Sequence, residues 1–277
     1  MPSEQCPPIK TIDRTENMRK SAIFMPAFAL LAGAAGCYLR LVELWNVFDE
    51  YTGLPQRGAG VTYMLIALTV AFLLIIFLFT LRSGLGYISP NGFENAFGSE
   101  ALAYPFTFFI IGLVWLGATV RHFINMNAGG DIPASELIFS VLSAFAAISS
   151  SLLAIEIYQD PQRKTKRALS IVPTIFMCYW LILLYRSNAS NPVLLSYCYQ
   201  CLAIIASALG FYFVSGFAYD KQAPCKTIFA FMAAIYFCFV TLADEQTASV
   251  RLIYIALIAI NVVYSSRLIK HMQKKAH

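Results

Sequence analysis

Arg163-Lys164-Thr165-Lys166-Arg167 is a cluster of four cations between two long apolar runs of the chain. Basic residues in short loops stay on the cytoplasmic side of a membrane. Placing this loop in the cytoplasm therefore also assigns a side to every other loop. We call the opposite side of the membrane the outer side.

The composition indicates a membrane protein. Of the 277 residues, 58% are hydrophobic and only 13% are charged, whereas a soluble domain has about 25% charged residues. Several apolar runs have about 20 residues, the length that a spanning helix needs. Runs such as Leu65 to Leu81 are apolar on every side, whereas the strands of a spanning barrel alternate apolar and polar residues. The sequence predicts an all-α, polytopic transmembrane bundle.

We predict eight spans with both termini in the cytoplasm, and seven spans as the alternative. A single transmembrane bundle, residues 21–269, lies between a polar tail of residues 1–20, expected to be unstructured, and a basic tail of residues 270–277. The predicted spans cover approximately residues 21–45, 61–81, 104–124, 135–157, 168–186, 193–218, 225–243 and 248–269.

The distribution of Lys and Arg supports the eight-span topology. In this layout fifteen of the 20 Lys and Arg residues lie on the cytoplasmic side, as expected for short loops. The five on the outer side are Arg40, Arg57, Arg121, Arg186 and Arg251. Removing one span would put either the basic tail or the Arg163–Arg167 loop outside. Five cytoplasmic segments that carry Lys or Arg suit a bacterial plasma membrane, with an organelle membrane as the alternative.

Charged residues gather at the outer ends of the spans. The middle thirds of all eight spans lack Asp, Glu, Lys, Arg and His, which disfavours a proton-coupled pump. Arg40 and Glu43 are three residues apart, so they share a helix face and can pair. The candidate ligand-binding residues are Arg40, Glu43, Arg121, His122, Arg186 and Arg251. If these ends converge, their guanidinium groups can bind an anion; otherwise the long side chains reach lipid headgroups individually.

Two functions from different classes remain open. One is a solute-binding or translocation subunit that receives an anionic or amphiphilic solute at an outward-facing rim of arginines. The other is a sensor or assembly subunit that docks another membrane protein or a cytoplasmic protein. Its docking residues would be Arg163, Lys164, Lys166 and Arg167, which can alternatively hold anionic lipid.

Catalysis and nucleic-acid binding are not expected. The sequence contains no GxSxG, Walker or GxGxxG motif. Its three histidines are too scattered for a catalytic metal, so we expect no cofactor. The basic residues form a layer at the membrane edge rather than a face with stacking aromatics. The partner expected in every case is the lipid bilayer.

Three further features carry local expectations. Cys198 and Cys201 form a CxxC pattern on an apolar run, where cysteines are typically packing residues rather than a redox pair. The long connection from Arg82 to Ala103 is predicted to be a surface linker, with a short amphipathic helix or a re-entrant turn as alternatives. Small residues are expected to allow close helix contact; among them are Gly33, Gly36, Gly112, Gly117 and Gly210.

Overall fold

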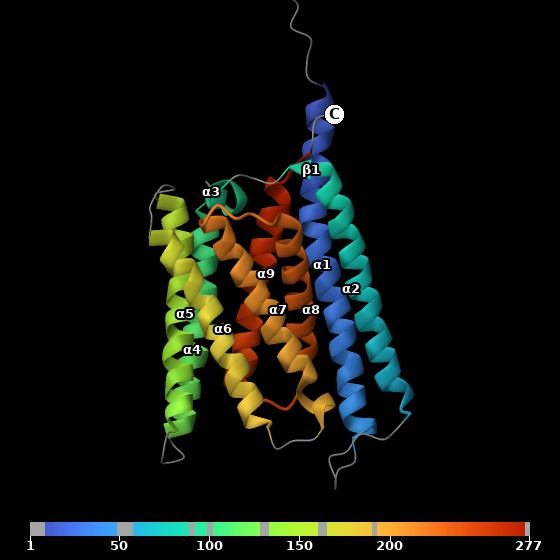
Figure 1. The fold of residues 1–277 in the computed structure, drawn as a ribbon, viewed down its shortest axis with the longest axis vertical. Coiled ribbons are helices and arrows are strands. Elements are labelled where there is room, and N and C mark those ends of the chain that lie inside the picture. The colour runs from blue at the N-terminus through green and yellow to red at the C-terminus, as the bar shows by residue number, and fades with distance from the viewer. Residues whose placement is uncertain are drawn as a thin grey trace, which may run out of the picture.

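The computed structural model describes residues 9–48, 58–88, 92–98, 102–127, 133–159, 165–189 and 193–274. Within these residues, eight helices are long and apolar enough to cross a membrane (Figure 1). A helix satisfies its backbone hydrogen bonds internally, as hydrocarbon requires. The eight predicted spans are confirmed, and the seven-span alternative is wrong.

The spanning helices are α1 (Ile9–Asn46), α2 (Gly60–Gly86), α4 (Ala103–Asn127), α5 (Ala134–Gln159), α6 (Thr165–Ser187), α7 (Leu194–Ala218), α8 (Pro224–Thr241) and α9 (Ala248–His271). The short elements are α3 (Gly92–Phe97), β1 (Tyr87–Ile88) and β2 (Gln273–Lys274). The two strands pair antiparallel and join the end of α2 to the segment after α9.

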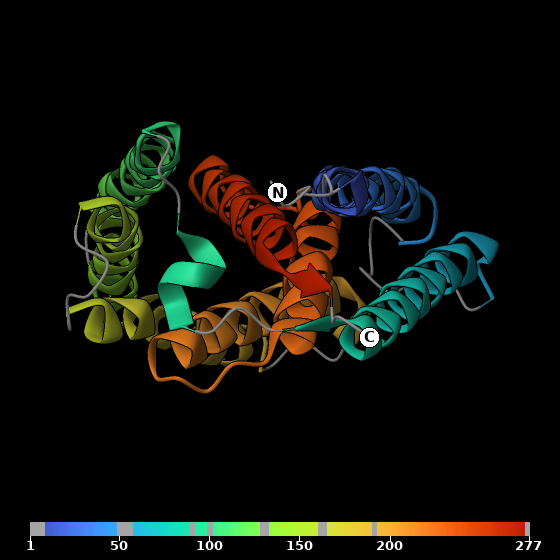
Figure 2. The same ribbon diagram turned by 90° about the horizontal axis from the view of Figure 1, so that it is seen from above.

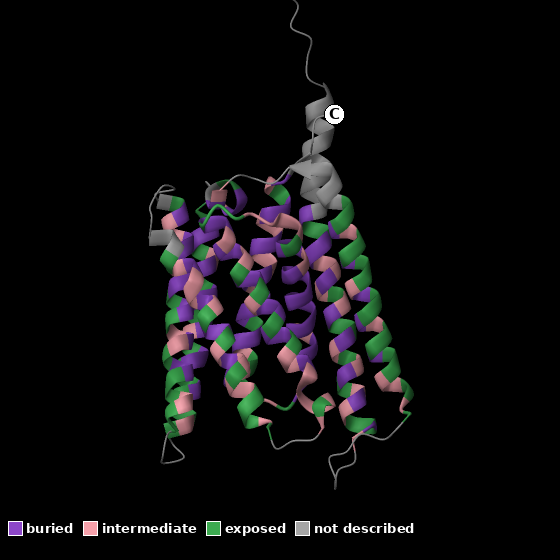
Figure 3. Ribbon diagram, viewed as in Figure 1, coloured by how far each residue is buried: buried purple, intermediate pink, exposed green. Residues whose placement is uncertain are grey.

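Six helices form a closed ring. From α4 to α9 each helix packs against the next, and α9 returns to pack against α4. Helix α1 packs against α8 and α9, and α2 lies beside α1, so both are on one side of the ring (Figure 2). Of the residues in the α8 span 72% are buried, against 28% for α2. The buried residues therefore concentrate around α8 (Figure 3).

Aromatic side chains fill the interior of this ring. The Trp180 ring lies 5.5 Å from that of Phe139 and 4.9 Å from that of Tyr254, measured between centroids. Closer to the cytoplasmic end, Tyr264 lies 4.9 Å from Phe108. Such tilted and edge-to-face pairs stabilise a packed core beyond their buried area.

The connection after α2 contains a buried helix. In α3, Phe93, Ala96 and Phe97 are buried, and the Phe97 ring packs against Tyr264 of α9 at 5.2 Å. His271 Nδ1 lies 3.0 Å from the carbonyl oxygen of Ala96. The prediction of a surface linker is therefore wrong at α3, where apolar side chains are covered by the bundle and not by lipid.

The first helix begins earlier than its apolar run. The backbone of α1 is helical from Ile9, whereas we predicted an unstructured tail as far as residue 20. That prediction is wrong for residues 9–20, and residues 1–8 lie outside the described part of the chain. Helix formation continues because a span that is already helical extends at low cost, one hydrogen bond per added residue.

Close contact between α1 and α8 depends on two glycines. A Cβ atom added at Gly33 would lie 2.7 Å from Phe239 Cβ, and one at Gly36 would lie 2.7 Å from Val240 Cγ2. These contacts are shorter than atoms tolerate, so α8 leaves no space for a side chain. At Gly117 an added Cβ has no neighbour within 4 Å, so the expected close contact is absent there.

We predict that Gly33→Ala destabilises the protein relative to Gly117→Ala. Both changes give the same gain in helix propensity, but only Gly33→Ala forces α1 away from α8. The difference in free energy of unfolding should be about 1 to 3 kcal/mol. Reversible unfolding in mixed micelles measures it, and equal stabilities for the two variants would contradict the packing described above.

Candidate functional site

The predicted pair on α1 forms, and it is fully buried. Arg40 Nη1 donates a hydrogen bond to Glu43 Oε2 at 2.7 Å, and both side chains have no exposed surface. The pairing follows from the three-residue spacing, which places both side chains on one helix face. The face is the one that α1 turns toward the rest of the bundle.

A second carboxylate also binds Arg40. Asp244, in the connection between α8 and α9, accepts a hydrogen bond from Arg40 Nε at 2.8 Å and is also buried. The sequence places Asp244 at the outer end of a span, but we did not include it among the candidate residues. The feature of the sequence that could have identified Asp244 is its position at the same membrane border as Arg40.

The other amino group of Arg40 is bound by α7. Nη2 donates to the carbonyl oxygens of Leu195 and Ser196, at 3.1 and 3.2 Å. The guanidinium carbon lies 5.4 Å from the ring centroid of Tyr199 and 5.9 Å from that of Phe48. Since Arg has five N–H donors and four hydrogen bonds are formed, little of this guanidinium is available to an anion.

Hydroxyl groups extend from this site between the helices. The Tyr199 hydroxyl lies 3.4 Å from Thr69 Oγ1 of α2, which lies 2.8 Å from the Tyr236 hydroxyl of α8. The Tyr236 ring stacks on Phe72 at 4.6 Å. The contacts of Arg40 with Tyr199 therefore connect the charged residues to α2 as well as to α7 and α8.

We call Arg40, Glu43 and Asp244 the outer charge cluster. It has one cation and two carboxylates, and it is closed to solvent. Within the described residues, Glu43 Oε1 and Asp244 Oδ2 have no hydrogen-bond partner. A buried carboxylate oxygen is costly without a donor, so these two atoms mark the point of the cluster where a hydrogen-bond donor would be most favourable.

Unpartnered polar atoms continue along the same connection. Both amide atoms of the half-buried Gln246 and the hydroxyl oxygen of the buried Ser249 have no partner in the described part of the chain. Arg251 Nη2 donates to the backbone carbonyl of Asp244 at 3.3 Å, while the rest of its side chain is exposed. The start of α9 therefore adds one peripheral cation, Arg251, beside the outer charge cluster.

Asp244 is poorly solvated. Burial raises the pKa of its carboxyl above the ordinary value of 3.8, although the charge of Arg40 opposes the change. Desolvation penalises the charged form, and the guanidinium of Arg40 and the hydrogen bond of the Gln200 side chain compensate only part of that penalty. Asp244 consequently takes up a proton at a higher pH than an exposed aspartate.

The remaining outer candidates do not join this cluster in the contacts of the described residues. Arg121 and Arg186 are exposed at the ends of α4 and α6. His122 is buried; its Nε2 lies 3.1 Å from Glu136 Oε2, which joins α4 to α5. Their roles in ligand binding stay predictions. Among the described arginines of the outer side, only Arg40 and Arg251 contact Asp244, and Arg57 lies outside the described residues.

The basic candidates on the cytoplasmic side are partly described. Arg163 and Lys164 lie outside the described residues, whereas Lys166 and Arg167 lie in the first turn of α6. Their role in docking a partner or lipid stays a prediction. Cys198 and Cys201 are free and half-buried on α7, as a packing role requires.

The chain has no match among known protein families, curated proteins or solved structures. Among the described residues, no group of three or more His, Cys, Asp and Glu is arranged to hold a metal ion.

We predict that Arg40→Met destabilises the protein by about 3 to 5 kcal/mol, because it leaves two buried carboxylates without a counter-charge. Arg121→Met and Arg186→Met are matched controls, because both side chains are exposed at outer helix ends, and they should change the unfolding free energy by at most about 0.5 kcal/mol. Equal losses in all three variants would show that Arg40 has no special structural role.

Proposed function

We propose that this integral membrane protein binds a small cationic solute from the outer side, through Glu43 and Asp244 of the outer charge cluster. The observation that supports this proposal is the pair of buried carboxylate oxygens without a hydrogen-bond partner in the described residues, Glu43 Oε1 and Asp244 Oδ2. Arg40 holds both carboxylates in position through their other oxygens.

The charge of the site favours a cation over the anion that the sequence suggested. Four donor contacts of Arg40 are already used within the protein, so an anion would have to displace them. The two carboxylates exceed the single buried cation by one negative charge. A cation that enters beside them removes this excess and supplies the missing hydrogen-bond donors.

A compact ammonium group has the appropriate chemistry. A primary ammonium carries three N–H donors, and two acceptors of the cluster, Glu43 Oε1 and Asp244 Oδ2, have no partner in the described part of the chain. A quaternary ammonium has the same charge but no N–H group. The site therefore discriminates between them by hydrogen bonding, because acceptors left unpaired in a buried site strongly disfavour the ligand that lacks donors.

We propose binding rather than coupled pumping or catalysis. The middle thirds of the predicted spans lack Asp, Glu, Lys, Arg and His, the residues that a proton relay uses. The outer charge cluster contains two carboxylates and a guanidinium, without a nucleophile and base in hydrogen-bond contact. A binding subunit requires only the recognition that these groups provide.

The test is ligand-dependent thermal unfolding of the purified protein. Methylammonium should raise the melting temperature, with about 2.7 kcal/mol of added stability at a concentration 100 times its Kd, while tetramethylammonium should not. Asp244→Asn, which keeps the shape of the side chain, should abolish the effect. Glu245→Gln is the matched control, because Glu245 is exposed in the same connection and its replacement should leave the effect intact.

The pH dependence gives a second readout of the same experiment. As the pH falls through the raised pKa of Asp244, this carboxyl becomes neutral and the net negative charge of the cluster is lost, so methylammonium binding should weaken. The charged groups around Asp244 are Arg40 and Glu43 of α1 and Arg251 of α9. Equal stabilisation by tetramethylammonium, or binding that persists in Asp244→Asn, would contradict the proposal.

A further inference from the structure

A second cation lies at the border of the outer charge cluster. Arg251, near the start of α9, donates from Nη2 to the backbone carbonyl oxygen of Asp244 at 3.3 Å. This contact directs the guanidinium back toward the residue whose carboxylate belongs to the cluster. The rest of the Arg251 side chain is exposed, so a solute that enters from the outer side meets this cation first.

Most of the hydrogen-bonding capacity of Arg251 is unused in the described part of the chain. A guanidinium has five N–H donors, and the Arg251 side chain makes this one hydrogen bond to the described residues. Arg40, by contrast, makes four. Arg251 can therefore still bind a carboxylate, in the paired geometry that guanidinium and carboxylate groups favour.

The N-terminus of α9 favours the same kind of ligand. Thr247 is the N-cap of this helix of 24 residues, and its side chain accepts a hydrogen bond from the backbone N–H of Val250. A helix N-terminus carries a partial positive charge that attracts anions. Arg251 extends from the first turns of α9 back to Asp244, which precedes the N-cap. The guanidinium and the helix dipole therefore attract negative charge to the same side of Asp244.

Opposite charges are thus presented on the two sides of Asp244. Its carboxylate belongs to a cluster with one excess negative charge, whereas its backbone carbonyl holds the Arg251 cation. Both groups belong to one residue, so the two charges are close together. A solute with only an ammonium group is attracted by the cluster and repelled by Arg251. A solute that also carries a carboxylate complements both.

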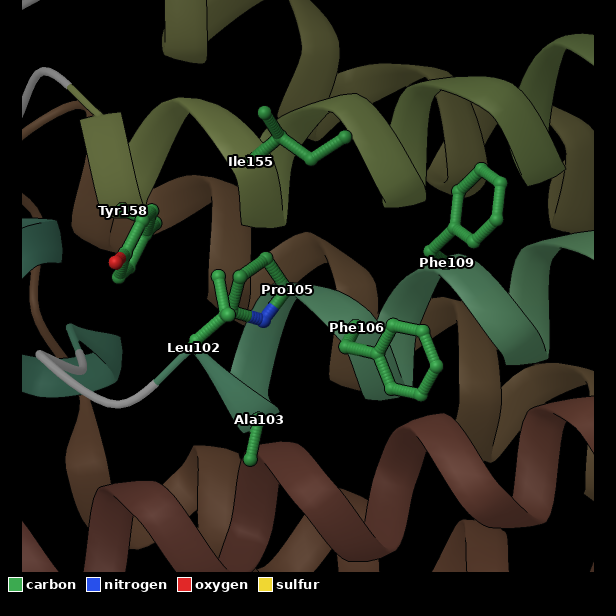
Figure 4. Close-up of a pocket in the computed structure, with 7 residues that line it drawn as sticks. All are labelled: Leu102, Ala103, Pro105, Phe106, Phe109, Ile155 and Tyr158. Carbon is green, nitrogen blue, oxygen red and sulfur yellow. The ribbon is translucent and has the colours of Figure 1, made fainter.

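The apolar groove between α4 and α5 at their cytoplasmic ends has no such pattern (Figure 4). Phe106, Phe109 and Ile155 contribute to its lining, and no charged side chain is among the described residues that line it. An apolar surface does not recognise the charged groups of a solute. Recognition of an ammonium group and a carboxylate together is therefore assigned to the outer side.

We propose that the ammonium-bearing solute is a small amino acid. Its ammonium group binds Glu43 and Asp244, and its carboxylate binds Arg251. This inference rests on the proposed function, because it assigns the second charged group of the same solute. The excess negative charge of the cluster and the positive charge of Arg251 cancel, as the two charges of an amino acid do.

Equilibrium dialysis of the purified protein in micelles tests this inference with methylammonium, glycine, glycinamide and acetate. Glycine carries both charged groups, glycinamide has the ammonium group without the carboxylate, and acetate has only the carboxylate. The wild-type protein should bind glycine about tenfold more tightly than glycinamide, because a charge-assisted hydrogen bond to Arg251 is added. Acetate should bind more weakly than glycine and glycinamide.

In Arg251→Gln, glycine and methylammonium should respond in opposite directions. Glycine should lose its advantage over glycinamide, whereas methylammonium should bind more tightly because a repelling charge is removed. Arg251→Lys, which keeps the charge, should retain part of the preference for glycine. Lys270→Gln is the matched control, because Lys270 is exposed in the last turn of the same helix at the cytoplasmic side, and it should change none of the four affinities.

Failure of this inference can be distinguished from failure of the proposed function. If the wild-type protein does not bind methylammonium, both are overturned. The inference alone is overturned if methylammonium binds but glycine has no advantage over glycinamide, if that advantage persists in Arg251→Gln, or if acetate binds as tightly as glycine. It is also overturned if Arg251→Gln weakens methylammonium and glycine equally, because Arg251 would then act only through the fold.

Discussion

Arg40 carries a full charge on a side chain with no exposed surface, and the surrounding residues compensate the cost of burying that charge. A charge in a low-dielectric environment is stable only when it is paired and its hydrogen bonds are formed. Glu43, Asp244 and two carbonyl groups of α7 meet that requirement. The outer end of α1 is consequently attached to α7 and to the connection between α8 and α9. Away from such borders, the bundle is held by apolar and aromatic packing together with buried hydrogen bonds between uncharged side chains.

These two kinds of contact hold the two parts of the molecule, the ring from α4 to α9 and the added pair α1 and α2. The ring from α4 to α9 is filled by aromatic side chains, with Trp180 and Tyr264 at the centres of two groups of contacts. Helices α1 and α2 add to the outside of this ring, where Gly33 and Gly36 allow α1 to approach α8 closely. Steric contact fixes the position of α1 across the membrane, and the charges of Arg40 and its partners fix its outer end. Within the described residues, one oxygen of each carboxylate is left without a hydrogen-bond partner.

Much of this architecture could be predicted from the sequence. Apolar runs of spanning length predict the eight helices, because hydrocarbon leaves no alternative for the backbone. The spacing of Arg40 and Glu43 predicts their pair, because i and i+3 share a helix face. Asp244 could not be paired with Arg40 in the same way, since the two residues are 204 positions apart and their contact depends on how α1 packs on α8. The burial of α3 could not be predicted either, because its six residues form a pattern too short to show which surface covers it.

The most direct test of this account is the coupling free energy between Arg40 and Asp244. It is obtained from a double-mutant cycle of Arg40→Met and Asp244→Asn, measured by unfolding the purified protein in micelles. A buried, hydrogen-bonded ion pair predicts a coupling of about 1.5 kcal/mol or more. A coupling below about 0.5 kcal/mol, as exposed pairs give, would contradict the central place of this interaction in the structure.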